Sequence, residues 1–181
     1  MDLQIAVFLN KLWSGTSMDF LTKFISSYFF LIALWTALII AVLFFDKKKR
    51  KILLITILIA IALHFLISEG IFKILLTNFF SLRVRPYLAH PDLITALGTN
   101  SDASFPSSHM SSTAAILTVF IYYYKKFWPV WTLGILFLFA MAFARIHNGM
   151  HYPTDVLAGT ILGIIYGITA VYATKKLSKQ S

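Results

Sequence analysis

Three short stretches of the sequence concentrate side chains that can act on a phosphate group. They are Arg85 in the first, Ser107 to His109 in the second, and Arg145, His151 and Asp155 in the third. Guanidinium groups bind phosphate oxygens in forked pairs and stay charged at any relevant pH. A neutral imidazole can attack phosphorus when its other nitrogen is held by an acceptor. Together the three stretches indicate phosphoryl transfer with a histidine nucleophile.

The spacing within the third stretch predicts how that nucleophile is oriented. Asp155 lies four residues after His151, which is one helical turn. If a helix begins near Pro153, the carboxylate reaches the imidazole Nδ1, fixes the tautomer and stabilises the cation formed on attack. His109 is then the candidate general acid for the leaving group. Its neutral form would take a proton from the water that completes the reaction.

The remaining side chains form a predicted phosphate clamp. A transferring phosphoryl group carries negative charge on its equatorial oxygens and needs fixed donors around it, a need that Arg85 and Arg145 meet. Ser107 and Ser108 follow Pro106 at the start of an apolar segment. The backbone N–H groups that begin such a helix form an anion site, and the two hydroxyls add donors.

The elements that must position these residues belong in a lipid bilayer. The chain has 181 residues, of which 59% are hydrophobic and 13% charged. That balance is too apolar for an ordinary soluble domain. At roughly 20 apolar residues for each crossing, five or six crossings would use nearly the whole chain. Residues 1–181 are therefore expected to form a single domain.

The apolar segments predict an all-α membrane protein, an antiparallel bundle of about six helices. The five expected spans cover residues 24–45, 52–82, 110–124, 128–144 and 156–173. Residues 3–13 form a shorter apolar run, which we expect to lie in the membrane interface rather than to cross.

The basic residues predict the orientation of the bundle. Runs of Lys and Arg at 47–51, at 125–126 and in the C-terminal tail fall on one side if the spans alternate, and that side is expected to be cytoplasmic. The net charge of +9 is thereby explained by topology rather than by nucleic acid as a partner. The loops at 83–109 and 145–153 meet on the opposite face of the plasma membrane, toward the periplasm or the outside.

The chemical residues also occur as motifs. Arg85-Pro86, Pro106-Ser107-Ser108-His109, and Arg145-x5-His151-x3-Asp155 resemble the three signature motifs of the type 2 phosphatidic acid phosphatase (PAP2) superfamily, and HYPTDVLAG (151–159) is similar to its bacterial lipid phosphatases. The resemblance implies a six-helix membrane bundle and hydrolysis through a phosphohistidine, with no metal and no cofactor. The implied partners are a lipid phosphate and the bilayer.

The sequence departs from that pattern at three positions. Asn78 stands where a Lys usually precedes the Arg of Arg-Pro by seven residues. Lys73 could replace that lysine only if the intervening segment bulges or carries an insertion, and Arg83 is a further candidate. Ser108 stands where Gly is usual and Ala144 where Ser is usual.

Other polar residues have structural explanations. Glu69 and Lys73 lie one turn apart within an apolar segment and are expected to neutralise each other. His64 is expected to bond a neighbouring helix. His90 and His147 lie in the outer loops, but their spacing matches no metal-ligand pattern.

The sequence is compatible with several functions. Relatives within the family act on phosphatidate, phosphatidylglycerol phosphate, undecaprenyl diphosphate and the 1-phosphate of lipid A. The size and arrangement of the chain resemble those of small bacterial members, including lipid A 1-phosphatases, so the last is favoured. Capture of the phosphohistidine by an alcohol would make a phosphotransferase, which product analysis would distinguish. A small anion transporter is a third possibility, although it predicts more charge within the spans than this sequence has.

Overall fold

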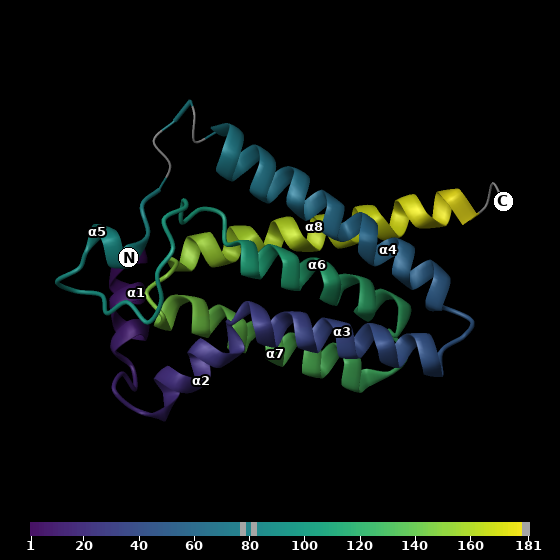
Figure 1. The fold of residues 1–181 in the computed structure, drawn as a ribbon, viewed down its shortest axis with the longest axis horizontal. Helices are drawn as coiled ribbons and strands as arrows, with labels where there is room; N and C mark the ends of the chain where they lie inside the picture. The colour runs from purple at the N-terminus through teal and green to yellow at the C-terminus, as the bar shows by residue number, and fades with distance from the viewer. Residues whose placement is uncertain (77–78, 81–82, 179–181) are drawn as a thin grey trace.

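The computed structural model describes residues 1–76, 79–80 and 83–178, whose regular structure is entirely helical. The elements in Figure 1 are α1 (Asp2–Lys11), α2 (Ser17–Ile25), α3 (Tyr28–Phe45), α4 (Arg50–Leu63), η1 (His64–Leu75), α5 (Pro86–Ala89), α6 (Ser108–Tyr123), α7 (Trp128–His147) and α8 (Pro153–Ser178). The expected all-α class is confirmed for the described residues. A π-helix, η1, continues α4 without a break.

Four helical segments are long and apolar enough to cross a membrane: α3, α4 with η1, α7 and α8. These correspond to four of the five expected spans. The fifth, α6, has 16 residues and is about 24 Å long, shorter than the hydrocarbon thickness of about 30 Å. Most of its residues are buried, so α6 forms the centre of the bundle. The six-helix bundle stays a prediction.

Glycines on α8 allow that helix to lie directly against α6. Gly159, Gly163 and Gly167 recur every four residues and so share one helix face. A Cβ atom at Gly159 would lie 2.5 Å from the Ser107 carbonyl oxygen, and one at Gly163 would lie 2.3 Å from that of Ser111. Close backbone contact therefore joins the beginnings of α6 and α8.

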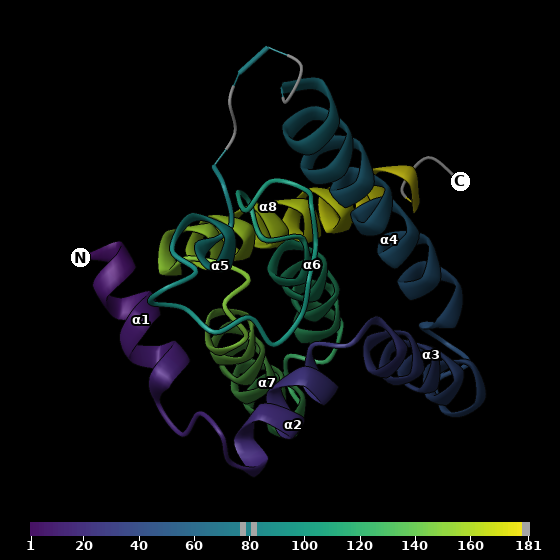
Figure 2. The same ribbon diagram turned by 60° about the vertical axis from the view of Figure 1, so that its left-hand side comes forward.

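The N-terminal segment forms two short helices rather than the single one expected over residues 3–13. The first, α1, has ten residues and is about 15 Å long, which is too short to cross. The second, α2, begins after Thr16, whose hydroxyl accepts the Met18 N–H. Both lie at the end of the bundle that carries α5, as Figures 1 and 2 show.

The two ends of the bundle differ in what they carry (Figure 1). The α3–α4 and α6–α7 connections lie at one end with the end of α8, and they carry the basic runs. At the other end, α5 and the chain that follows it pass over the ends of α6 and α7 (Figure 2). The two polar loops of the sequence therefore meet at one end, opposite the basic runs.

Candidate active site

All seven candidate site residues are buried at this end of the bundle. They are Arg85 before α5, Ser107, Ser108 and His109 at the start of α6, Arg145 in the last turn of α7, His151 between α7 and α8, and Asp155 in the first turn of α8. The turn before His151 depends on Gly149, because its φ is +73° and a Cβ there would lie 2.9 Å from the Thr95 carbonyl oxygen.

The imidazole of His151 lies between two guanidinium groups. Its Nε2 is 3.3 Å from Nη1 of Arg85 and 3.4 Å from Nη2 of Arg145. Its Nδ1 donates a hydrogen bond of 2.8 Å to the Ser104 carbonyl oxygen, which can only accept, so the lone pair is assigned to Nε2. Burial, then the charges of Arg145 and Arg85, lowers the pKa of His151 well below 6.5. The candidate nucleophile is therefore neutral at neutral pH, with its lone pair facing the clamp.

The expected hydrogen bond between Asp155 and His151 is absent, since Asp155 Oδ2 lies 4.0 Å from the imidazole Nδ1. Instead, Oδ2 accepts the Ser104 hydroxyl at 2.6 Å and the Tyr152 N–H at 2.8 Å. The helix α8 begins only at Pro153, so His151 lies outside it and helical spacing does not bring the two side chains together. Asp155 reaches back to the backbone at the start of its own helix, as the third residue of a capping box does.

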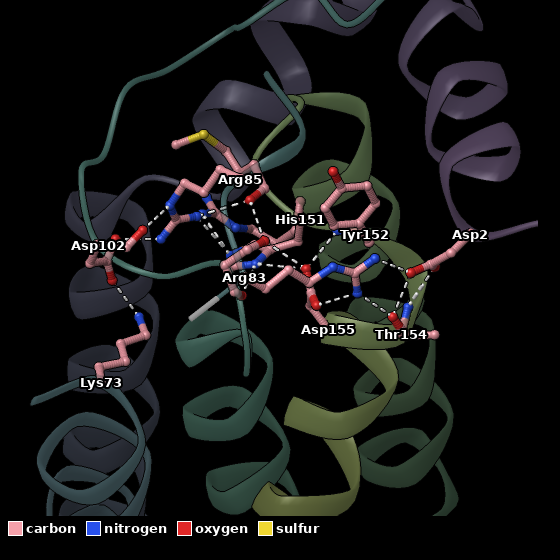
Figure 3. A network of polar contacts seen from close by, with 12 residues as sticks. Asp2, Lys73, Arg83, Arg85, Asp102, His151, Tyr152, Thr154 and Asp155 are labelled. Carbon is pink, nitrogen blue, oxygen red and sulfur yellow. Dashed lines mark hydrogen bonds and ion pairs between the residues drawn. The ribbon is translucent and has the colours of Figure 1, made fainter. Parts of the chain in front are cut away.

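The first clamp arginine is held in place by several acceptors. Arg85 Nε donates to the Asp102 carbonyl oxygen at 3.0 Å, and Nη1 donates to the Met150 carbonyl oxygen at 3.0 Å. Its Nη2 forms an ion pair with the Asp102 carboxylate (Figure 3). The guanidinium plane is thereby fixed beside His151.

Other buried polar atoms around His151 have no hydrogen-bond partner in the described residues. They are Nε of Arg145, the hydroxyls of Ser107 and Ser108, and Nε2 of His109; the Thr113 hydroxyl in α6 and the Asn148 side-chain oxygen after α7 also have none. Leaving a buried donor unpaired costs about 1–3 kcal/mol. Such a cluster, concentrated beside two arginines, fits a site that binds an anion with several acceptor oxygens.

Asp102 is a site residue that sequence reasoning missed. Its carboxylate bridges Arg85 and Lys73, and the Lys73 Nζ is 2.6 Å from Oδ2. Partial burial raises the pKa of Asp102, but hydrogen bonds and charge from Lys73 and Arg85 outweigh it and lower the pKa below its usual value. No periodicity or motif could have singled out one acid in a polar loop.

The structure separates the candidates for the missing motif lysine. Lys73 lies on η1, the wider π-helical segment, and reaches Arg85 through Asp102. Arg83 points instead toward Asp155 (Figure 3), and Nη1 lies 2.9 Å from Oδ1 of that residue. Asn78 lies outside the described residues. Lys73 therefore contacts the clamp through Asp102, whereas the bulge expected between Lys73 and Arg85 falls on a segment that is only partly described.

Of the other polar residues, Glu69, His64 and His147 have partners within the protein. Lys73 pairs with Glu69 at 3.6 Å, which confirms the expected neutralising pair. His64 Nδ1 lies 3.0 Å from the Ser111 hydroxyl on α6, which confirms a bond to a neighbouring helix. His147 bonds the Leu9 carbonyl oxygen and lies 2.9 Å from Asp19, so it is committed to α1 and α2.

Two cavities reach the site from different sides. One of about 500 Å³ lies between α3 and the α4–η1 segment, and it is lined by apolar residues together with Lys73, Asp102 and His109. The other, of about 330 Å³, is lined largely by polar residues, including Lys23, Asn148, Arg145 and His109. His109 lines both cavities.

Comparison with known proteins places this geometry in a family. Residues 58–179 match the PAP2 superfamily. The chain is 38% identical to undecaprenyl-diphosphatase BcrC of Bacillus subtilis over 84 residues, which are 46% of this chain and 41% of that protein. It is 31% identical to the lipid A 4'-phosphatase of Porphyromonas gingivalis over 156 residues, which are 79% of this chain and 63% of that protein.

The fold is also similar to a solved structure. The crystal structure of Aquifex aeolicus LpxE is matched with a TM-score of 0.71 at 24% identity, over 94% of each chain. The chain spans less than half the length of BcrC and a little under two thirds of the Porphyromonas protein. The family match covers more than half of this chain and includes every candidate site residue. The chain therefore belongs to the PAP2 superfamily of membrane phosphatases.

Proposed function

We propose that this protein is a membrane lipid phosphatase that hydrolyses a phosphate monoester or diphosphate through a phosphohistidine on His151. The observation that carries the proposal is the position of His151 Nε2, which faces Arg85 and Arg145 with its lone pair. That atom can attack a phosphorus whose oxygens are bound by the same two guanidinium groups. Ser107 and Ser108 supply further donors from the start of α6.

The reaction then proceeds in two steps. His151 Nε2 forms a bond to phosphorus while the bond from phosphorus to the leaving oxygen breaks, and His109 as an imidazolium donates its proton to that oxygen. Water next attacks the phosphorus, His109 takes the proton of the water, and the phosphorus–nitrogen bond breaks. Phosphate leaves, His151 is again neutral and His109 holds the proton taken from the water. Burial and the charge of Arg145 lower the pKa of His109 well below 6.5, so this imidazolium has to form while the anionic phosphate is bound beside it.

The cavity of about 500 Å³ supports a lipid substrate. Its wall combines apolar side chains of α3, such as Leu31 and Trp35, with Phe65 of η1, and it ends at His109. Only 11% of the α3 residues are buried within the protein, so we infer that the groove beside this helix faces the bilayer. A lipid chain can lie there with its phosphate beside Ser108 and His109, which line the same cavity.

Among lipid phosphates we favour the 1-phosphate of lipid A. The supporting comparisons are the fold likeness to LpxE and the 31% identity to a lipid A 4'-phosphatase over 79% of the chain. Undecaprenyl diphosphate is supported by the shorter match to BcrC. Phosphatidylglycerol phosphate and phosphatidate complete the set of substrates to be tested.

A phosphotransferase is the second candidate, favoured by the polar cavity of about 330 Å³ beside His109 and Arg145. An alcohol bound there would take the place of water in the second step. The product would be a phosphorylated acceptor instead of free phosphate.

The test measures phosphate release by the purified protein in detergent, with excess EDTA, from the four lipids. We expect release from at least one lipid by the wild type and none by His151→Ala or His151→Gln. A 32P label on the substrate should appear on the wild-type protein after acid-free quenching, since phosphohistidine is acid-labile. Formation of a phosphorylated alcohol, with no free phosphate unless the alcohol is added, would support the phosphotransferase. Phosphate release by both His151 variants at the wild-type rate would refute the mechanism.

A further inference from the structure

The acceptor that orients His151 is itself held in place by two neighbours. The Ser104 carbonyl receives the His151 Nδ1–H, and Ser104 is fully buried. The Ser104 N–H donates to the Arg83 carbonyl oxygen at 2.8 Å, and the Ser104 hydroxyl donates to Asp155 Oδ2 at 2.6 Å. The direction of the imidazole therefore depends on Arg83 and Asp155 together.

Arg83 closes these contacts into a ring. Its backbone holds the Ser104 N–H, while its guanidinium Nη1 binds Oδ1 of the same Asp155 that receives the Ser104 hydroxyl, at 2.9 Å. Figure 3 shows the guanidinium beside Asp155, close to His151. Three residues thus surround the carbonyl that fixes the nucleophile.

The ring also has an electrostatic requirement. Asp155 is fully buried, and Arg83 is the one Lys or Arg that pairs with it in the described part of the chain. A buried carboxylate that loses its cation is strongly destabilised. A carboxylate that moved away in response would no longer accept the Ser104 hydroxyl, so the charge on Arg83 stabilises the ring.

The outer side of Arg83 is anchored by the N-terminal helix. Its Nη2 forms an ion pair with Asp2 of α1, and its Nη1 donates to the Thr154 hydroxyl at 2.6 Å. Asp2 in turn accepts the Thr154 N–H at 3.1 Å, so α1 caps the beginning of α8. The guanidinium also lies over the Tyr152 ring at 3.7 Å. A forked, planar cation can make these contacts at once, which an ammonium cannot.

These contacts separate Arg83 from the phosphate clamp. The guanidinium groups of Arg85 and Arg145 lie 3.3 Å and 3.4 Å from His151 Nε2. The guanidinium of Arg83 is instead bound by Asp155, Asp2 and Thr154. We propose that Arg83 is a positioning residue for His151, which fixes the Ser104 carbonyl through Asp155 while Asp2 of α1 holds its guanidinium. The inference rests on the proposed function, in which His151 is the nucleophile.

The kinetic test compares Arg83→Met and Arg83→Lys with the wild type on the best lipid substrate. In Arg83→Met we expect kcat to fall on the order of 10- to 100-fold, the range seen when the partner that orients a ligating imidazole is removed. The KM and the inhibition constant of inorganic phosphate should stay within about threefold, because Arg85 and Arg145 are untouched. Arg83→Lys keeps the charge but cannot donate to Asp155 and Asp2 from two separate nitrogen atoms. Its kcat should therefore lie between those of the wild type and Arg83→Met.

The matched control is Lys49→Met, which breaks the Lys49–Asp46 ion pair of 3.6 Å at the other end of the bundle. Its kcat should equal that of the wild type. An Arg83→Met kcat within threefold of wild type would overturn the proposal. So would a loss of phosphate affinity as large as the loss of kcat, because Arg83 would then belong to the clamp. If the Met variant does not fold, Arg83→Lys carries the same comparison.

A second measurement needs no activity. In protein with 15N-labelled histidine, assigned by His151→Gln, wild-type His151 should carry its proton on Nδ1 alone at pH 7.5. Arg83→Met should show a mixture of tautomers, with Lys49→Met unchanged. If the wild type proved inactive on every lipid, the proposed function would fail while this spectrum still tested the positioning role. An unchanged spectrum in Arg83→Met would overturn the positioning role of Arg83.

Discussion

At the scale of single residues, the same two side chains that can bind phosphate also prepare the nucleophile. Arg85 and Arg145 face His151 Nε2, and their charges disfavour a proton on that nitrogen. A protonated imidazole has no lone pair for attack, so the clamp keeps the candidate nucleophile in its reactive form. Asp102 and Lys73 extend the charged cluster toward the cavity of about 500 Å³.

The pH dependence of His151 follows from its surroundings. Burial and the charges of Arg145, Arg85 and His109 lower its pKa well below 6.5, while the one facing carboxylate, Asp155, is 4.0 Å away. We therefore expect kcat/KM to show no loss from His151 protonation between pH 7.5 and 6.5. Arg145→Met should move the pKa of His151 upward, as an NMR titration of its Cε1 resonance would measure.

The same shift has a consequence for stability. The unfolded chain takes up a proton on this histidine near pH 6.5, whereas the folded protein resists it until a lower pH. The stabilisation is therefore fully present above pH 6.5 and is lost as the pH falls through the folded pKa. A wild-type titration midpoint at or above 6.5 would contradict the assignment of a neutral His151.

At the scale of helices, two local features bring the site together. The π-helix η1 carries Lys73 to Asp102, although Lys73 lies twelve residues before Arg85 in sequence. The glycine face of α8 lets α6 approach so closely that the Ser107 N–H donates to the Asp155 carbonyl oxygen at 3.1 Å. The second and third sequence motifs are therefore joined by backbone contact.

The helix contact predicts a matched pair of substitutions. In Gly163→Ala the new Cβ would lie 2.3 Å from the Ser111 carbonyl oxygen, which is backbone and cannot move aside. We expect a loss of about 1–3 kcal/mol in stability and a lower Tm, as for other overpacked sites. Gly134→Ala is the control, because its Cβ would meet only the flexible end of Leu117 at 3.1 Å.

Thermal unfolding in detergent, followed by circular dichroism, measures both variants. Equal Tm values for Gly163→Ala and Gly134→Ala would show that α6 and α8 do not touch along this face. A lower Tm for Gly163→Ala together with reduced phosphatase activity would fit a displacement of Ser107 from Asp155.

At the scale of the whole molecule, one end of the bundle carries the basic runs and the other end carries the candidate active site (Figure 1). The α3–α4 connection contains Lys47 to Lys49, whereas the loop after α5 lies over the candidate site at the other end. Positive residues remain in the cytoplasm when membrane proteins insert. We therefore propose that the site opens to the periplasm or the outside of the cell.

The absence of cysteine from the chain allows a direct test of this orientation. Single cysteines at Lys48 and Asp92, both exposed, would mark the two ends. In intact cells, or in spheroplasts if there is an outer membrane, a membrane-impermeant maleimide should label Asp92→Cys and leave Lys48→Cys unmodified until lysis. The reverse pattern would place the site in the cytoplasm.

The sequence by itself determined the membrane class, the approximate bounds of the long helices and a set of candidate site residues that the fold brings together. These follow from composition, from the length of apolar runs and from motifs, which are local properties of the chain. Five apolar segments correspond to five long helical segments, and all seven candidate residues gather at one end. The short helix α2 was missed because its polar start at Ser17 interrupts the apolar pattern.

Only the tertiary structure decided which groups hold the candidate nucleophile. The sequence predicted that the Asp155 carboxylate accepts the Nδ1–H of His151. The acceptor is instead the backbone carbonyl of Ser104, 47 positions away along the chain. Every residue carries a backbone carbonyl, so no side chain in the sequence marks the one that accepts this hydrogen bond. Its position depends on how a long loop packs against α8. The roles of Asp102 and Arg83 are equally hidden, because a charge in a loop pairs with whichever opposite charge the fold brings within reach.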